Sequence, residues 1–339
     1  MWLRVLPLAF LFHAHTCTAG ISNHSCPNPV AADDVGEDSA LSFLQVMATV
    51  ESPFSQPTRE QAQRLHMAKP IDWLHVPKTG STFLNALVQH PLLCPEATSS
   101  MIITPEEDQA LRTFRHENSV REVCRGSFAR GNGLGFHYGI GSAYSKKKGH
   151  LMMFARDPKG RIISAFNFHQ HSWPLSKQAK GIKAYANLMK GQFLKMLVRD
   201  YSRQMSGFAT KRFFVQEPTA WEIREARKRV KEGFAFVGIT EEWELSMCLF
   251  HKKFGGPCIK SEFLVCHPAF SDPNDRQDQE RALRNWKDDF DGPLYEYARK
   301  LFHEELKRFD VSAETCGKCF EQAGVSALLA DDELFRREH

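Results

Sequence analysis

The sequence lacks the long apolar stretch of a membrane-spanning helix, and neither sign of charge dominates it. No run of about 18 apolar residues occurs in the 339-residue chain. Its 44 basic and 40 acidic residues leave a net charge of +4, which is too small to require nucleic acid or an anionic membrane as partner. With 21 glycines and 17 prolines, the chain also lacks the composition of collagen or of disordered proteins. We therefore expect a globular protein with no nucleic-acid partner, in which any anion-binding site is local.

Cysteine is scarce, with nine in the chain. Removal of Cys17 with a predicted leader leaves an even number, which permits disulfides in an oxidising compartment. Cys316 and Cys319 form a CxxC pair, but the chain has no second CxxC and no histidine pair at zinc-finger spacing. We expect a local disulfide or free thiols at this pair, and no metal site in the protein.

The first 20 residues carry the signals of a secretory leader. Arg4 precedes an apolar run from Val5 to Phe12, and small residues follow at 16–20. This order is typical of a signal peptide, which we place at residues 1–19. The prediction implies the secretory pathway, either the Golgi lumen or secretion, and the sequon at Asn23 agrees with a glycoprotein. The alternative is an uncleaved N-terminal segment that associates with a membrane.

Composition divides the rest of the chain into three parts. Residues 20–69 are rich in proline and acidic side chains and predict a linker or stem, with one helix over the apolar stretch 41–50. Apolar runs alternate with amphipathic segments over residues 70–310, which predicts the folded domain. Residues 311–339 predict an appended tail.

Three short apolar runs in the domain predict strands, and each is followed by a predicted helix. The strands are expected at Ile71–Val76, Leu151–Arg156 and Phe234–Ile239. The helices are expected at Ser81–His90, Asp157–His169 and Glu241–Phe254, the last capped by Thr240. This repetition predicts an α/β fold, a three-layer domain with a central parallel sheet flanked by helices.

The turn between the first strand and its helix has the composition of an anion site. Its sequence, PKTGST over residues 77–82, is called the PKTGST turn below. Gly80 lets the backbone approach a ligand closely, and Lys78 adds a positive charge. Amide groups at the helix start can donate hydrogen bonds, as can the hydroxyls of Thr79, Ser81 and Thr82. The pattern predicts a phosphate or sulfate site, the alternative being a tight turn with a solvated lysine.

The second predicted strand ends in a similar set of residues. Arg156 follows the apolar run, Asp157 can cap the helix that Pro158 opens, and Ser164 lies about two turns further on. A guanidinium fork and a hydroxyl suit a phosphate monoester. We therefore predict that Arg156 and Ser164 bind one phosphate, the alternative being a salt bridge between Arg156 and Asp157.

Together, the PKTGST turn and the segment RDPxxRxxSxF (156–166) resemble the two nucleotide-binding motifs of sulfotransferases. These enzymes use 3′-phosphoadenosine 5′-phosphosulfate (PAPS), and the likeness is greatest to the heparan sulfate 2-O- and 6-O-sulfotransferases. Weaker likenesses follow in the same order at RQMSGF (203–208), FVGITEE (236–242) and LYEYA (294–298). The resemblance implies a P-loop-like α/β fold and a sulfotransferase domain over residues 70–310.

The resemblance also implies roles for single residues. It implies that the 5′-phosphosulfate is held by Lys78, Thr79, Gly80, Ser81 and Thr82, and the 3′-phosphate by Arg156 and Ser164. The related enzymes carry a catalytic histidine in a short segment before the 3′-phosphate motif, which here contains His137. An imidazole accepts a proton near neutral pH, so His137 is the predicted base, with His75 and His169 as rivals.

The predicted activity is transfer of the sulfuryl group of PAPS to a hydroxyl of a glycan or polysaccharide. His137 would act as base in an in-line displacement, while Lys78 stabilises the leaving group without a metal. A protein tyrosine is an alternative acceptor. Two other function classes stay open: a nucleotide-dependent phosphoryl-transfer enzyme, although the Walker pattern GxxxxGK[ST] is absent, and a non-catalytic secreted glycan-binding protein.

Two clusters of basic residues lie outside these motifs. Five basic residues within 224–231 alternate with glutamates, which predicts a solvated helix face. The run Lys146-Lys147-Lys148 has no acidic residues beside it in the sequence. It is therefore the better candidate for contact with an anionic acceptor, the alternative being a solvated loop.

Overall fold

The computed structural model describes residues 57–98, 101–102, 122–129, 137–168, 170, 179–201, 213–264 and 273–326. All of them belong to one compact unit, Glu51–His339. The predicted signal peptide, the sequon and His169 lie outside the described residues. Within the described ranges, no helix is both long and apolar enough to cross a membrane.

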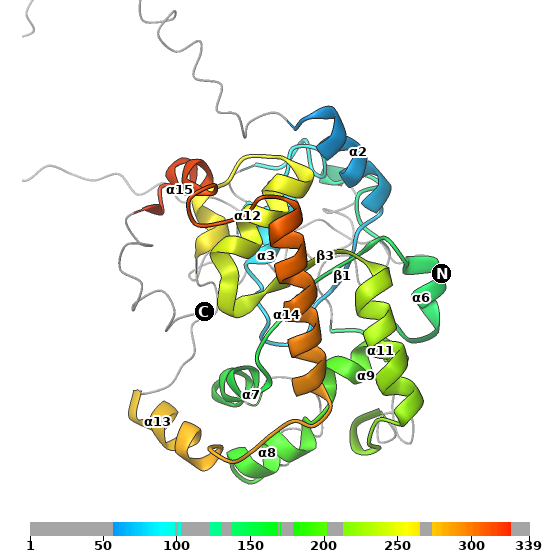
Figure 1. Ribbon diagram of the computed structural model, residues 1–339, viewed down its shortest axis with the longest axis vertical. Coiled ribbons are helices and arrows are strands. Elements are labelled where there is room, and N and C mark those ends of the chain that lie inside the picture. The colour runs from blue at the N-terminus through cyan, green and yellow to red at the C-terminus, as the bar shows by residue number, and fades with distance from the viewer. Residues whose placement is uncertain are drawn as a thin grey trace, which may run out of the picture. The chain divides into compact units, whose positions relative to one another are not determined.

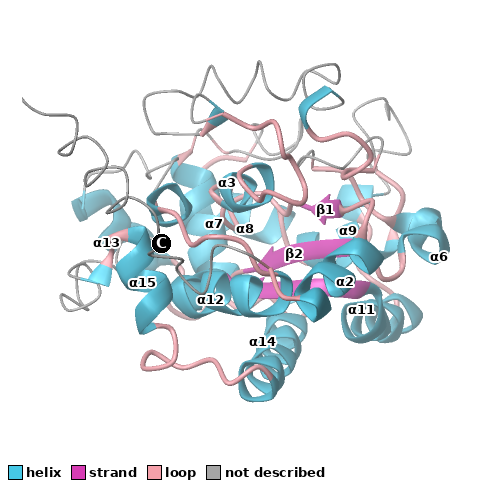
Figure 2. Ribbon diagram, turned by 90° about the horizontal axis from the view of Figure 1, so that it is seen from above, coloured by secondary structure: helices cyan, strands magenta, loops and turns pink. Residues whose placement is uncertain are grey.

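Three parallel strands lie at the centre of the described chain (Figure 2). They are β1 (Asp72–Leu74), β2 (Leu151–Ala155) and β3 (Phe234–Ile239), hydrogen-bonded in the order β1-β2-β3. The register pairs Trp73 with Met152 and Phe154 with Gly238. β1 and β2 are buried throughout, as strands covered on both faces must be. The predicted parallel sheet flanked by helices is confirmed.

Helices and short 3-10 turns connect these strands and surround them (Figure 1). The elements before β3 are α2 (Arg59–Ala68), α3 (Phe83–Val88), η2 (Gly141–Ala143), α6 (Tyr144–Lys147), α7 (Pro158–Asn167), α8 (Ile182–Leu188), α9 (Gln192–Val198) and α11 (Ala220–Gly233). Those after β3 are η4 (Thr240–Glu242), α12 (Trp243–Phe254), η5 (Lys260–Phe263), α13 (Pro273–Ala282), α14 (Asp291–Arg308) and α15 (Gly317–Ala323). The helices α12 and α14 pack on β3, and α14 also contacts β2.

Local sequence signals explain the start of α7 but not that of α12. The Asp157 carboxylate accepts the Gly160 N–H at 2.8 Å, and Pro158 occupies the first helical position. Thr240 does not cap α12, so that prediction is wrong; the helix begins at Trp243, after the 3-10 turn η4. The Thr240 hydroxyl is instead used in contacts with two other strand ends, described below.

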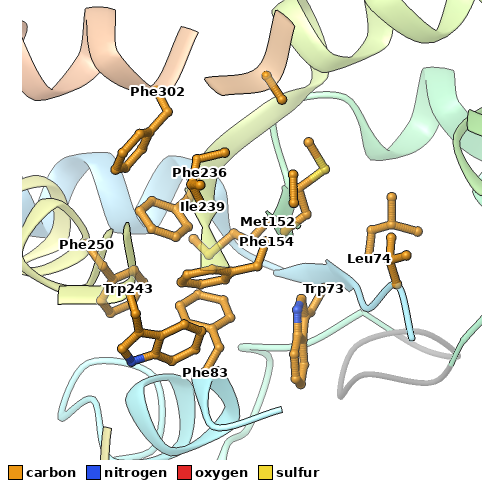
Figure 3. Close-up of a cluster of buried hydrophobic side chains, with 14 of the residues drawn as sticks. Trp73, Leu74, Phe83, Met152, Phe154, Phe236, Ile239, Trp243, Phe250 and Phe302 are labelled. Carbon is orange, nitrogen blue, oxygen red and sulfur yellow. The ribbon is translucent and has the colours of Figure 1, made fainter. Parts of the chain in front are cut away.

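A cluster of aromatic side chains forms part of the hydrophobic core (Figure 3). Phe83, the first residue of α3, has its ring centroid 5.0 Å from that of Phe154, 5.5 Å from that of Phe236 and 5.3 Å from that of Phe250. All four side chains are fully buried. Burial of each contributes on the order of 1.5–3 kcal/mol. The first turn of α3 is therefore anchored in the aromatic part of the core.

Segments at both ends of the described chain pack on this core. The helix α2, within the predicted stem, begins with a capping box of Thr58 and Gln61. The Gln61 side chain also donates to two carbonyls at the end of α12. At the other end, α15 follows α14 within the predicted tail and contacts η5. Residues 57–69 and 311–326 thus contribute to the fold.

Three disulfides link distant parts of the chain. They join Cys94 to Cys124, Cys248 to Cys316 and Cys258 to Cys319. The expectation of a local disulfide or free thiols at the CxxC pair is wrong, because Cys316 and Cys319 meet separate partners in and after α12. Sequence spacing carries no information about such long-range contacts. Three disulfides are compatible with a protein of the secretory pathway or the extracellular space.

The basic residues of the two clusters have more polar partners in the fold than their local sequence indicates. Lys147 pairs with the buried Asp72 at 2.7 Å, and Lys148 with Glu232 at 3.0 Å. Both partners are distant in sequence, so these lysines are paired in the fold although no acidic residue stands beside them in the sequence. Contact of the lysine run with an anionic acceptor stays a prediction. In the second cluster, Arg229 is buried and donates to two backbone carbonyls. Its basic neighbours on α11 are exposed, as predicted.

Replacement of Cys248 and Cys316 together by serine should lower the free energy of unfolding by about 2–5 kcal/mol, because the disulfide closes a loop with a sequence separation of 68. Guanidinium denaturation measures this change. The double replacement of Cys94 and Cys124, whose separation is 30, is the matched control and should cost less. Peptide mapping of the unreduced protein should recover the Cys248–Cys316 peptide pair; a Cys316–Cys319 linkage would contradict the assignment.

Candidate functional site

The two predicted phosphate-binding segments meet at one edge of the sheet. Parallel strands end at the same edge, so the chain leaves β1, β2 and β3 side by side. Nη1 of Arg156, after β2, donates to the carbonyl oxygen of Lys78, after β1, at 3.1 Å. The Thr240 hydroxyl, after β3, lies 3.2 Å from the carbonyl oxygens of both Thr79 and Ala155. These contacts join the three strand ends into one site.

The backbone of the PKTGST turn forms a concave set of N–H groups. Lys78 has φ 65° and Gly80 has φ 99°, whereas Thr79 between them has a negative φ. Such alternation turns successive N–H groups toward one side, a geometry that binds anions. Within the described part of the chain, the N–H groups of Gly80, Ser81 and Thr82 donate to no acceptor. The turn therefore offers three amide donors beside the Lys78 side chain.

The hydroxyl groups of the turn have different roles. Thr79 donates its hydroxyl to the Val76 carbonyl at 2.8 Å, and Thr82 donates to the Leu264 carbonyl at 2.8 Å. Both threonine side chains are buried. Ser81 is half-buried. Thr79 and Thr82 thus shape the turn with their side chains, so an anion there would be contacted mainly by amides and by Ser81.

Gly80 is in tight contact with Trp243, the first residue of α12. A Cβ atom at residue 80 would lie 2.3 Å from Cζ3 of the indole. The indole cannot retreat easily, because its Nε1 donates to the Glu262 carbonyl at 2.8 Å and its ring stacks on Phe154 with centroids 4.4 Å apart. Residue 80 must therefore be glycine for steric reasons as well as for its positive φ.

The two cations of the site are held partly out of water. Burial, with a further contribution from the Arg156 charge, lowers the pKa of Lys78 to about 8. Burial also lowers the pKa of Arg156, against the opposing charge of Glu241. Nε of Arg156 is buried and has no hydrogen-bond partner among the described residues. An anion at this position would satisfy that donor and compensate both charges.

Glu241 and Tyr295 form hydrogen bonds next to Arg156. Glu241 accepts the Asp157 N–H through one carboxylate oxygen and the Tyr295 hydroxyl through the other, both at 2.9 Å. The first of these oxygens lies 3.9 Å from Nε of Arg156. The carboxylate facing Arg156 is thus that of Glu241, whereas Asp157 caps α7. No role was predicted for either residue, although Glu241 lies in the FVGITEE segment and Tyr295 in the LYEYA segment.

Ser164 lies on the face of α7 that Arg156 contacts. A Cβ atom at Gly160 would be 3.8 Å from Nε of Arg156. Ser164 follows Gly160 by four residues and therefore lies on the same helix face, one turn further along. Its side chain is 9% exposed. The predicted pairing of Arg156 with Ser164 is compatible with this arrangement.

His137 lies at the start of the PKTGST turn. Its Nδ1 is 2.8 Å from the carbonyl oxygen of His75, and the two imidazole centroids are 4.6 Å apart. A carbonyl only accepts, so Nδ1 carries the proton and the lone pair of the neutral ring is on Nε2. His75, the rival, is buried and stacks on Trp73. The geometry is compatible with a role for His137 as base, which stays a prediction.

Among the described residues, no group of three or more His, Cys, Asp or Glu side chains could hold a metal ion. Comparison of the chain with protein-family models, with curated proteins and with solved structures finds no match. The function of the site is therefore inferred from its own geometry and from the sequence motifs.

Replacement of Gly80 by alanine should lower the free energy of unfolding by about 2–5 kcal/mol, because it combines a strained φ with the Trp243 contact. Gly149→Ala is the matched control, since Gly149 has φ 87° but no atom within 4 Å of the added methyl group. It should cost only about 1–2 kcal/mol. Urea denaturation measures both variants, and equal costs would contradict the role of Trp243.

Proposed function

We propose that this chain is a PAPS-dependent sulfotransferase that sulfates a hydroxyl of a glycan or polysaccharide. The observation that carries the proposal is the hydrogen bond from Arg156 Nη1 to the Lys78 carbonyl. It brings the cations of two separate anion-binding segments to one edge of the sheet. PAPS carries anionic groups at both its 5′ and its 3′ positions, so it needs two such segments close together.

The local arrangement also supports a P-loop-like site. A strand, a tight turn with free amide donors and a helix follow one another, as in sites that bind phosphate through backbone N–H groups. The lysine differs from the Walker pattern, because Lys78 precedes Gly80. This difference favours transfer of a sulfuryl group over ATP-dependent phosphoryl transfer.

Residues of the site can carry out each step of the proposed reaction. Nε2 of His137 accepts the proton of the acceptor hydroxyl, whose oxygen forms a new bond to sulfur. The bond between sulfur and the 5′-phosphate oxygen breaks, and its electron pair stays on that oxygen. Lys78 and the amides of residues 80–82 stabilise the resulting charge, and 3′-phosphoadenosine 5′-phosphate leaves.

The acceptor and the compartment follow from the resemblance and the disulfides together. The likeness to enzymes that sulfate heparan sulfate favours a carbohydrate hydroxyl as acceptor. The three disulfides are compatible with a lumenal enzyme, and the Golgi is the proposed location. A secreted glycan-binding protein on the same fold would share these features but would have no turnover.

The native chain should be stabilised selectively by 3′-phosphoadenosine 5′-phosphate. At 100 times its dissociation constant, the nucleotide should add about 2.7 kcal/mol, or roughly 5 °C or more in Tm. AMP should do less, because it lacks the 3′-phosphate that Arg156 is proposed to bind. Arg156→Gln should remove the difference between the two nucleotides, whereas the exposed Arg281→Gln should keep it.

Thermal unfolding with each nucleotide measures these differences. Stabilisation by ATP with magnesium alone would instead indicate a phosphoryl-transfer enzyme. Absence of a response to any nucleotide would contradict the proposal and favour the glycan-binding protein.

Replacement of His137 by glutamine should lower turnover by about a hundredfold to ten-thousandfold, because the acceptor loses its base. Glutamine keeps a donor for the His75 carbonyl, so affinity for 3′-phosphoadenosine 5′-phosphate should change little. Sulfate transfer to a mixed glycan acceptor, with calorimetry of nucleotide binding, measures the two effects separately. His66→Gln, on the exposed side of α2, is the control. Unchanged turnover in His137→Gln would exclude His137 as the base.

A further inference from the structure

One aromatic contact of Lys78 lies outside the proposed reaction. The Lys78 ammonium is 4.1 Å from the centroid of the Phe168 ring. A cation at this distance over a ring face is attracted by the negative charge density of that face. The attraction acts on the charged form of the lysine and not on the neutral amine.

The position of Phe168 follows from the geometry of α7. Its backbone N–H donates to the Ser164 carbonyl at 3.1 Å, so it continues the helix by one residue. Gly160, Ser164 and Phe168 are spaced by four residues and lie on one face. The Gly160 end of this face is next to Arg156, and the Phe168 end is next to Lys78. One helix face therefore spans both proposed anion-binding segments.

Among the described residues, the groups that act on the pKa of Lys78 do not favour its charged form. Burial and the Arg156 charge both lower the pKa of Lys78. Glu241, whose carboxylate lies 3.9 Å from Nε of Arg156, is not among the described groups that shift the pKa of Lys78. The helix α3, which follows the PKTGST turn, has no charged residue. The Phe168 ring is thus the contact in the described structure that stabilises the ammonium.

Other charged groups of the surrounding elements have polar partners of their own. Arg161 of α7 pairs with Asp291 of α14, and the Asp157 carboxylate is used by the α7 N-terminus. Arg276 of α13 is close enough to affect Arg156 but is paired with Glu280 of its own helix.

We propose that Phe168 is a positioning residue for Lys78, its ring holding the ammonium in place and charged beside the PKTGST turn. The ligand that this charge meets, the 5′-phosphosulfate, rests on the proposed function. The contact between Lys78 and Phe168 does not rest on the proposed function, and it can be tested without a nucleotide.

The test is trace acetylation of the full chain with acetic anhydride between pH 6 and 10, followed by mass spectrometry of the Lys78 peptide. Only the neutral amine reacts, so the rate, normalised to its plateau, gives the Lys78 midpoint, expected at about 8 in the native protein. Phe168→Leu keeps an apolar side chain but removes the ring. It should lower the midpoint by about 0.5–1.5 units.

Two further variants separate this effect from a general loosening of α7. Phe168→Tyr keeps an aromatic face and should have the native midpoint. Phe166→Leu makes the same change two residues away, where the ring packs on Tyr185 with centroids 5.6 Å apart. It should also have the native midpoint, whatever it does to stability.

An unchanged midpoint in Phe168→Leu would overturn the proposal. A raised midpoint would overturn it too, because it would mean that the ring acts only by excluding water. A lowered midpoint restored by tyrosine supports it. Calorimetry with 3′-phosphoadenosine 5′-phosphate then tests the functional part: Phe168→Leu should bind about 3–10-fold more weakly at pH 8 and nearly normally at pH 6.5. If the native chain binds no bisphosphate while the midpoint shifts, the proposed function fails and the assignment of Phe168 stands.

Discussion

The site depends on a hydroxyl group that joins three strand ends. The Thr79 carbonyl belongs to the PKTGST turn, beyond the end of β1, and the Ala155 carbonyl belongs to the last residue of β2. The buried Thr240 hydroxyl lies 3.2 Å from both oxygens and supplies the donor. A buried carbonyl without a donor costs about 1–3 kcal/mol. This contact therefore fixes how the PKTGST turn and Arg156 lie relative to each other, and with them the two proposed phosphate positions.

Behind this edge, a buried polar network fixes α7. Arg161 donates to Asp291 at 3.4 Å and also to Gln192, while Asp291 accepts the N–H groups of Phe193 and Leu194 at the start of α9. Burial and the nearby Asp288 raise the pKa of Asp291, against the effect of Arg161. Removal of one partner would leave a buried charge uncompensated, which is strongly destabilising. The network thus fixes α7 close to the site, because Arg161 and Asp291 line the same pocket as Arg156.

The features that could be predicted from the sequence are set by neighbouring residues. The features that could not be predicted depend on contacts between residues that are distant in the chain. The three strands lie in mainly apolar runs because helices cover them, and the PKTGST turn is defined by adjacent residues, so both were visible in the sequence. Threonine is a common helix-capping residue, yet the Thr240 hydroxyl donates to two carbonyls that are distant in the sequence. Likewise, the partners of Cys316 and of Lys147 lie far away in the chain. No spacing in the sequence predicts these partners, and none predicts the contact between Phe168 and Lys78.

The energetics of Lys78 distinguish a ligand-binding turn from a merely structural one. A non-glycine residue with φ 65° costs on the order of 1–3 kcal/mol, and a half-buried cation beside Arg156 adds a further cost. Glycine or asparagine at this position would avoid both costs if the turn only connected β1 to α3. The aromatic cluster around Phe83 supplies enough stability to tolerate them. An anion bound between Lys78 and Arg156 would turn their mutual repulsion into attraction toward a shared partner, so the cost is greatest without ligand and is recovered on binding.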